Sequence, residues 1–196
     1  MVVLDSLYFR FGSPACREIN RSWERGDIST PDEIRGCFAT MSTSQMELEA
    51  FLDTVPIDPT FSQAYEYFCK NGFPFAIVSD GLRWYIEYIL HRFGIEGMCV
   101  YANEIQFEPG GYQFSFPWYD DHTPKRGTGK RAIVQNYQKD GFRVVFIGDG
   151  LTDTDAALTA DLVYARAGLA DFTRANSIPA IEFSDYGDLL SKWQTS

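Results

Sequence analysis

The sequence predicts an α/β protein with a Rossmann-like, doubly wound parallel sheet and a small helical cap. Short apolar runs alternate with segments of helical periodicity from about residue 56 onward. Residues 12–55 show helical periodicity throughout and contain no run typical of a strand. The composition, 45% hydrophobic and 22% charged over 196 residues, is that of one well-buried globular domain. We therefore expect a core of residues 1–11 and 56–196 and a cap of residues 12–55.

The first segment is predicted to be a helix of the core. Its apolar residues recur at helical spacing until Gly12-Ser13-Pro14 ends the pattern, and they are Val3, Leu4, Leu7, Tyr8 and Phe11. In the alternative, the run VVL is a strand that presents Asp5 at its end. The spacing favours the helix.

The cap is predicted to hold three short helices, in the stretches PACREINRSWERGD, STPDEIRGCFATM and STSQMELEAFLDTV. Ser29-Thr30-Pro31 begins the second of them, because proline suits the first turn and the acids behind it suit the helix dipole.

The remaining chain alternates between helices and strands. Asn71-Gly72 and Gly94 mark two helix ends, and Pro109-Gly110-Gly111 marks a hairpin turn. We predict strands in residues 73–79, 98–105 and 142–150 and a final one in 162–167, helices in 60–72, 81–94, 127–141 and 153–162, and a hairpin insertion over 104–119.

The net charge, the length of the apolar runs and the cysteine spacing exclude some classes of function. A net charge of −10 argues against a protein that binds nucleic acid or membrane surfaces, because phosphate-rich partners attract basic patches. No run approaches the 18 apolar residues of a membrane span, and the N-terminus lacks the pattern of a signal peptide. We expect a cytoplasmic location or an equivalent reducing compartment. The cysteines, Cys16, Cys37, Cys69 and Cys99, form no metal-ligand spacing and are expected to be buried or partly buried free thiols.

Polar residues follow three predicted elements at the edge where doubly wound sheets bind ligands. Ser79-Asp80-Gly81 follows an apolar strand, Lys130 opens a helix, and Asp149 and Asp153 follow the strand VVFIG. Ser79 offers a hydroxyl and nearby N–H groups to a phosphate, and Lys130 offers a point charge. Each also has a plain interpretation, as a helix cap or as a solvated helix residue.

The closely spaced carboxylates after the strand VVFIG should repel one another. A divalent cation such as Mg²⁺ would relieve this repulsion, because carboxylate oxygens are the protein ligands that Mg²⁺ prefers. We interpret Asp149 and Asp153 as the metal-side acids, although Asp153 also suits a helix cap. Asp155 fits better as a first-turn acid of the following helix.

The order of these motifs resembles that of the haloacid dehalogenase superfamily, within its phosphoserine-phosphatase-like branch. FAIVSDG resembles the second motif of that family, Lys130 its third-motif lysine, and IGDGLTD its fourth motif. The resemblance extends over nearly the whole chain. It implies a Mg²⁺-dependent phosphatase for a small phosphomonoester, in which Ser79, Asp80, Gly81 and Lys130 bind the phosphate and Asp149 and Asp153 bind the metal.

The first motif of that family, DxDGT, does not occur in the sequence. The first Asp of this motif attacks phosphorus, so the resemblance implies a chain without its nucleophile that hydrolyses phosphate esters poorly. We expect the 196 residues to begin just downstream of that motif. Two alternatives stay open: Asp5 is a relic nucleophile, or the protein is a non-catalytic binding or assembly subunit that pairs with a partner strand.

Four aromatic residues are candidates for the substrate end of the site: Trp23, Trp84, Tyr85 and Trp118. Each of them alone is more typical of a core position than of a binding site. The identity of the substrate does not follow from the sequence.

Overall fold

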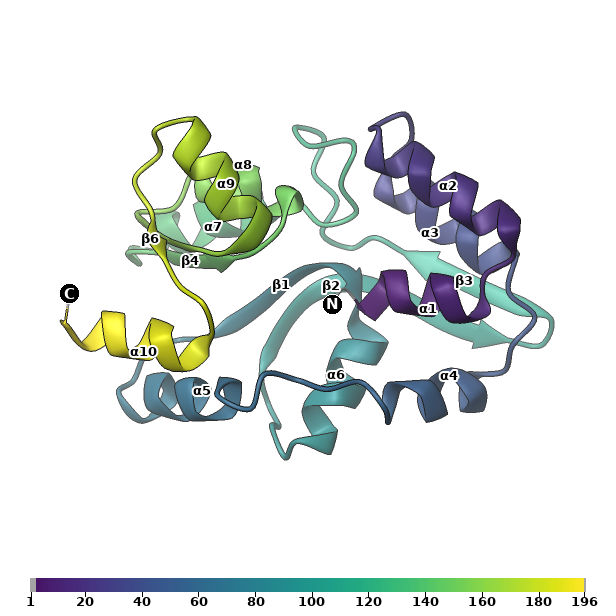
Figure 1. The fold of residues 1–196 in the computed structure, drawn as a ribbon, viewed down its shortest axis with the longest axis horizontal. Coiled ribbons are helices and arrows are strands. Elements are labelled where there is room, and N and C mark those ends of the chain that lie inside the picture. Colours follow the sequence, from purple (N-terminus) through teal and green to yellow (C-terminus); the bar gives the residue numbers. More distant parts are fainter. Residues whose placement is uncertain (1–2, 196) are drawn as a thin grey trace. The chain divides into compact units, whose positions relative to one another are not determined.

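The structure is a computed structural model that describes residues 3–195. Helices and strands alternate along most of the chain, which confirms the predicted α/β class (Figure 1). The helices are α1 (Val3–Phe11), α2 (Pro14–Glu24), α3 (Thr30–Ala39), α4 (Gln45–Leu52), α5 (Phe61–Lys70), α6 (Arg83–Arg92), α7 (Lys130–Lys139), α8 (Thr154–Ala157), α9 (Ala167–Ala175) and α10 (Tyr186–Thr195). The strands are β1 (Ala76–Leu82), β2 (Cys99–Glu108), β3 (Gly111–Ser115), β4 (Val145–Gly148), β5 (Leu162–Ala165) and β6 (Ile181–Glu182).

The chain forms two compact units, each built from segments that are discontinuous in sequence. The first unit comprises the residues up to Pro56 together with Ala76–Gly129, and the second comprises Ile57–Phe75 and Lys130–Ser196. The first unit therefore joins the predicted cap to α1, β1, α6 and the hairpin. The division into a cap of residues 12–55 and a separate core stays a prediction.

The first unit contains a three-stranded sheet in the order β1-β2-β3. β2 runs parallel to β1 and antiparallel to β3, and the predicted hairpin is confirmed. Glu108 pairs with Gly111 across a two-residue turn, and Gly110 in that turn has a φ of 93°. Glycine suits this position because side chains make a positive φ costly.

Helices α1 to α4 follow the predicted signals closely. Ser13, Ser29 and Ser44 each cap a helix, with the side-chain oxygen accepting a hydrogen bond from a backbone N–H in the first turn. Ser44 forms a complete capping box with Glu47. Phe38 of α3 is fully buried against the hairpin.

The N-terminal segment is the helix that its apolar spacing predicts. Asp5 lies in the first turn of α1, and Leu4, Leu7 and Tyr8 of the same helix are buried. Since Asp5 does not end a strand, the alternative in which it is presented as a nucleophile is wrong for this structure.

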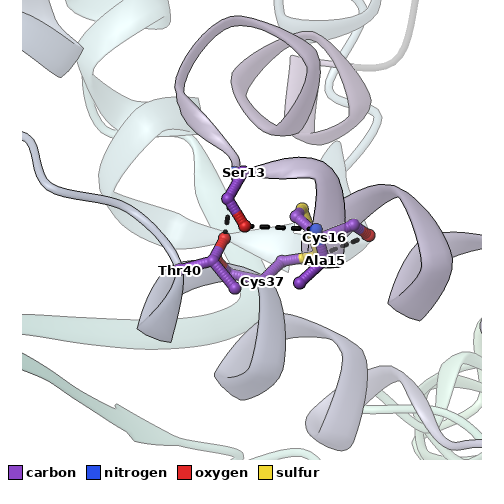
Figure 2. Close-up of a disulfide and its surroundings, with 5 residues drawn as sticks. All are labelled: Ser13, Ala15, Cys16, Cys37 and Thr40. Carbon is purple, nitrogen blue, oxygen red and sulfur yellow. Dashed lines mark hydrogen bonds between the residues drawn. A yellow bond between two sulfur atoms is a disulfide. The ribbon is translucent and has the colours of Figure 1, made fainter.

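The cysteines differ from their prediction. Cys16 of α2 and Cys37 of α3 form a disulfide, and both residues are fully buried (Figure 2). Packing of the two helices brings their Cα atoms to 4.5 Å, which a sequence separation of 21 residues does not reveal. Cys69 and Cys99 are free as predicted, but they are exposed. Because disulfides persist mainly in oxidising compartments, the cysteines no longer support a reducing location.

The second unit contains a parallel sheet in the order β4-β5-β6. Apolar residues of β4 and β5 pack on one side against α8 and α9, with Leu169 fully buried. On the other side, Tyr164 and Phe68 join a cluster that includes Trp193 of α10. The sequence prediction ended too early, because β5 is not the last strand: α9, β6 and α10 follow it.

Within residues 3–195, β1 pairs only with β2 and β4 pairs only with β5, so each strand has one edge without a strand partner. The helices of this part of the chain are all too short or too polar to cross a membrane.

Candidate functional site

The Ser79-Asp80-Gly81 segment lies in a bulge at the end of β1. Val78 pairs with Tyr101 and Leu82 pairs with Asn103, so β1 advances four residues while β2 advances two. The extra residues leave the ladder, and α6 begins directly afterwards at Arg83. The sequence predicted these residues at a strand end, and the bulge places them there.

The Ser79 hydroxyl oxygen accepts a hydrogen bond from the Gly81 N–H at 3.0 Å. This turn leaves the hydroxyl hydrogen of Ser79 available as a donor. Glycine is needed at position 81 for a steric reason, because a Cβ atom there would lie 1.6 Å from the hydroxyl oxygen of Tyr85. Any larger residue would therefore displace either the bulge or a buried tyrosine.

The Asp80 carboxylate fixes the loop that precedes Lys130. One oxygen accepts hydrogen bonds from the N–H groups of Gly127 and Thr128 at 2.9 and 2.8 Å. The other accepts one from the Thr30 hydroxyl at 3.3 Å. These bonds give the side chain a structural role, and direct ligand binding by Asp80 stays a prediction.

The sequence analysis missed two fully buried polar residues beside this bulge. The Asn103 side-chain amide donates to the Asp80 carbonyl oxygen at 2.7 Å, and the Thr128 hydroxyl donates to the Asn103 oxygen at 3.3 Å. Buried polar groups need such partners, and here they join β2 to the loop. The available signal was an asparagine inside an otherwise apolar strand, MCVYANEI.

In the second unit, Lys130 and Asp153 form a buried ion pair. The Lys130 ammonium lies 2.6 Å from one Asp153 oxygen and 3.4 Å from the Thr152 hydroxyl, and both charged side chains are less than a tenth exposed. Burial alone would raise the pKa of the Asp153 carboxyl. The Lys130 charge and two backbone N–H groups outweigh burial, so the pKa lies below its ordinary value.

Asp153 also shapes the turn after β4. Its second oxygen accepts hydrogen bonds from the N–H groups of Asp149 and Gly150, both at 3.0 Å. A Cβ atom at Gly148 would lie 2.8 Å from that oxygen, so glycine is needed for the close approach. Both Asp153 oxygens are thus engaged within the protein.

Asp149 is the acid of this turn that is free to face solvent. Its side chain is 59% exposed, and one oxygen lies 3.3 Å from the Arg166 guanidinium. Within residues 3–195, no group of three or more acids, histidines or cysteines is arranged to hold a metal. Mg²⁺ is commonly bound through one or two carboxylates, waters and a substrate phosphate, so the exposed Asp149 carboxylate fits as a direct ligand. Metal binding by Asp153, directly or through water, stays a prediction.

The predicted site residues belong to different units. Ser79, Asp80 and Gly81 lie in the first, and Lys130, Asp149 and Asp153 lie in the second. The structure brings together Lys130, Asp149 and Asp153. That Ser79 shares a pocket with them stays a prediction.

The candidate aromatic residues all have packing partners in the first unit. The Tyr85 side chain is buried, the Trp84 ring packs on Phe107 and the Trp118 ring packs on Tyr101. The Trp23 indole N–H donates to the Thr30 hydroxyl at 3.0 Å. Tyr85 thus occupies a core position, whereas Trp23 and Trp84 are partly buried and Trp118 is 36% exposed.

Comparisons with known proteins give the chain a family. The model of the haloacid dehalogenase-like hydrolases matches residues 7–158. A 2-hydroxy-3-keto-5-methylthiopentenyl-1-phosphate phosphatase of Brevibacillus brevis is 27% identical over 188 residues, covering 92% of this chain and 83% of the relative. A phosphatase of the same name from Exiguobacterium sibiricum is 30% identical over 142 residues, covering 71% of this chain and 64% of the relative.

Solved structures share the fold. A probable phosphoserine phosphatase from Vibrio cholerae aligns with a TM-score of 0.68 and 17% identity, covering 90% of this chain and 54% of that one. A phosphoserine phosphohydrolase-like protein from Francisella tularensis aligns with a TM-score of 0.65 and 18% identity, covering 96% and 89%.

Proposed function

Because this chain belongs to the family of haloacid dehalogenase-like hydrolases, we propose that it binds a small phosphomonoester with the help of Mg²⁺ and hydrolyses it poorly. The observation that supports this best is the buried Lys130–Asp153 pair beside the exposed Asp149 carboxylate. A lysine is rarely buried unless its charge is paired or used.

In this proposal, Lys130 holds a phosphate oxygen and Asp153 holds Lys130. The Asp153 carboxylate keeps the ammonium charged and aimed, while its hydrogen bonds fix the Asp149 turn. Ser79 donates its hydroxyl hydrogen to a second phosphate oxygen. Mg²⁺ bound at Asp149 supplies positive charge to the phosphate.

Low turnover follows from the lack of a suitable acceptor for the phosphoryl group. The sequence contains no DxDGT motif, and Asp5 lies inside α1. Charge stabilisation around the phosphate does not replace a nucleophile, whose loss commonly costs several orders of magnitude in rate.

The test is a Mg²⁺-dependent assay of the full chain with an aryl phosphate and a panel of small phosphate esters, beside calorimetry with inorganic phosphate. We expect phosphate binding that requires Mg²⁺ and is weakened at least tenfold by Asp149→Asn, with turnover near background. Asp155→Asn is the matched control, because Asp155 shares the acidic stretch but has no proposed ligand role.

Three results would contradict the proposal. Rapid turnover that Asp5→Asn abolishes would make Asp5 the nucleophile. Turnover that is indifferent to Asp5 but lost with Asp149→Asn would indicate direct attack by water. Phosphate binding unchanged by Asp149→Asn would show that the metal assignment is wrong.

We also propose an alternative function, a non-catalytic binding subunit. The partly buried apolar strands β1 and β4 each offer one edge without a strand partner in the described residues, and a partner chain adds readily at such an edge. Hydrogen exchange tests this alternative: rapid exchange of the β4 amides that slows when a partner is added supports it. Slow exchange in the isolated chain contradicts it.

We keep the cytoplasm as the proposed location, with a small phosphorylated molecule as ligand and no nucleic-acid partner; the Cys16–Cys37 disulfide does not support this location. The net charge of −10 supports the lack of a nucleic-acid partner.

A further inference from the structure

Helix α3 and the β2–β3 hairpin meet through aromatic side chains in the first unit. Tyr112 and Phe114 lie two residues apart on β3. Because successive side chains of a strand point to opposite faces, these two rings share one face of the hairpin. The Phe38 ring of α3 packs against both of them, with ring centroids 5.2 Å apart in each pair.

Beside these contacts, α3 and the hairpin border a groove with a volume of about 480 Å³. Volumes of about 300–1,000 Å³ are typical of sites for small molecules. At the hairpin turn the groove is open, because a Cβ atom on Gly110 or on Gly111 would have no neighbouring heavy atom within 4 Å. The residues that line the groove all belong to the first unit, and they are Arg35, Phe38, Ala39, Met41, Gly110, Gly111, Tyr112 and Phe114.

The aromatic rings of the groove offer a held but partly uncovered apolar surface. Phe38 is fully buried, whereas Tyr112 and Phe114 keep part of their surface exposed. The Tyr112 hydroxyl donates a hydrogen bond to the Thr43 carbonyl oxygen at 2.8 Å, which holds this ring in place. Covering exposed apolar surface is favourable, and aromatic rings pack well against another ring.

Arg35 is the charged residue of the groove lining. The carbon atom of its guanidinium lies 4.7 Å from the centroid of the Phe116 ring, which is a favourable cation–π distance. Within residues 3–195, Arg35 makes no ion pair with an acid, although acids outnumber bases in the sequence by 27 to 17. The N–H donors of its guanidinium are therefore available to an anionic ligand.

This combination of one positive charge with apolar rings selects a class of ligand. A guanidinium binds a carboxylate through two parallel hydrogen bonds, and aromatic rings bind another ring in edge-to-face or offset contacts. A cationic ligand would be repelled by Arg35. A small inorganic anion would leave the rings uncovered. An aromatic carboxylate matches both the charge and the rings.

We propose that this groove binds a small aromatic carboxylate. The Arg35 guanidinium pairs with the carboxylate, and the ring of the ligand packs against Tyr112 and Phe114. The site goes beyond the proposed phosphatase function and does not depend on it, because its lining contains none of the residues that are proposed to hold phosphate or Mg²⁺.

An amide NMR titration of the full chain with phenylacetate tests the site. Phenylacetamide serves as the uncharged counterpart with the same ring, and acetate as the anion without a ring. We expect saturable shifts in residues 35–41 and 110–114 with phenylacetate, at the millimolar or somewhat tighter affinity usual for so few atoms. Phenylacetamide should bind at least tenfold more weakly, and acetate should give no saturable shift.

Arg35→Gln tests the charge. It should weaken phenylacetate binding at least tenfold and leave the weak binding of phenylacetamide unchanged. Arg17→Gln is the matched control, because Arg17 is also an exposed arginine beside an aromatic ring, 5.7 Å from the centroid of Phe9, but does not line the groove. The two substitutions change the net charge equally, so a difference between them is local.

Ala39→Leu tests the place of binding. Ala39 is an exposed residue of α3 that lines the groove, and leucine is a strong helix former, so the fold should be retained while the larger side chain fills the space. We expect weaker binding of both phenylacetate and phenylacetamide. Ala50→Leu, at an exposed position of α4, is the control and should bind both as the wild type does.

Equal affinities for phenylacetate and phenylacetamide, no saturable shift with either, or unchanged phenylacetate binding in Arg35→Gln would overturn the proposal. So would groove signals that move with protein concentration in the absence of ligand, because a second copy of the chain would then cover the groove. Since phenylacetate carries no phosphate, these results are distinct from a failure of the phosphatase assay.

Discussion

At the scale of single residues, the site depends on carboxylates whose surroundings differ sharply. Asp153 is buried but paired with Lys130, so its charge is stabilised. Glu33 is buried among other acids, so its charge is disfavoured. Asp149 stays largely exposed. The same functional group therefore has three different roles, which the surrounding charge and burial decide.

Glu33 should make the protein less stable as the pH rises. Burial and neighbouring acids raise its pKa from 4.5 to about 8 in the folded protein. The folded state then binds more protons than the unfolded state between these values. The contribution of Glu33 to the free energy of unfolding is therefore fully present below about pH 4.5 and decreases as the pH rises to about 8. Urea unfolding at pH 5 and pH 8 should show a loss of up to about 3–4 kcal/mol, an upper limit for this interval from the pKa difference.

Glu33→Gln should flatten this pH dependence, because the amide does not titrate. The exposed Glu18→Gln should leave it unchanged. An equally steep pH dependence in Glu33→Gln would assign the effect to another group.

Asp153→Asn should destabilise the second unit. The substitution leaves the Lys130 ammonium buried without its partner, and breaking one side of a buried pair commonly costs about 3–5 kcal/mol. Urea unfolding at pH 7 measures the loss, with Asp155→Asn as the control. Because the pKa of Asp153 is lowered, the contribution of the pair is present above about pH 4 and disappears as the pH falls further. If Asp153→Asn were as stable as Asp155→Asn, the pair would lack this structural role.

At the scale of elements, α2 and α3 are joined both by hydrogen bonds and by a covalent bond. The Ser13 N–H donates to the Thr40 hydroxyl at 3.3 Å beside the Cys16–Cys37 disulfide (Figure 2). Ser13 precedes α2 and Thr40 follows α3, so these contacts hold one end of each helix. α3 also carries Glu33, the buried acid whose raised pKa makes stability depend on pH.

Reduction of the disulfide should lower the stability of the first unit. Closing a loop of this length restricts the unfolded chain and stabilises the fold by about 3 kcal/mol. Unfolding with and without a reductant, beside Cys37→Ser, measures the effect. Cys69→Ser is the control, since that cysteine is free and exposed.

Alkylation followed by mass spectrometry checks the pairing itself. Two cysteines should react in the native, unreduced protein and four after denaturation and reduction. Four reactive cysteines in denaturant without a reductant would show that the disulfide is absent.

At the scale of the whole molecule, charge is the dominant property. A net charge of −10 makes the folded chain repel itself and any polyanion. The positive groups that the proposed function needs are therefore local: Lys130 is held by Asp153, and Arg166 lies beside Asp149.

Added salt should stabilise the protein at low ionic strength. Screening reduces the self-repulsion, and a gain of about 1 kcal/mol corresponds to an increase in Tm of about 2–4 °C for a chain of this size. Calorimetric scans between low and physiological concentrations of NaCl, repeated with KCl, measure the change. A Tm that falls over this range would show that attractive ion pairs outweigh the net repulsion.

The sequence by itself determined the fold class, most elements and the order of the site motifs. Helical spacing in residues 3–11, serine caps before α2 to α4 and the Pro109-Gly110 turn are local signals, and the structure follows them. The elements after β5 were not predicted. The short strand β6 is defined by its pairing with β5, which no local sequence pattern indicates.

Only the tertiary structure decided which distant side chains meet. The Cys16–Cys37 disulfide and the Asp80 bonds to residues 127–128 each join segments more than 20 residues apart. Sequence patterns report local backbone preference and which face of an element is buried. Which partner a buried charge or thiol finds depends on helix packing and strand register, and these are set by the chain as a whole.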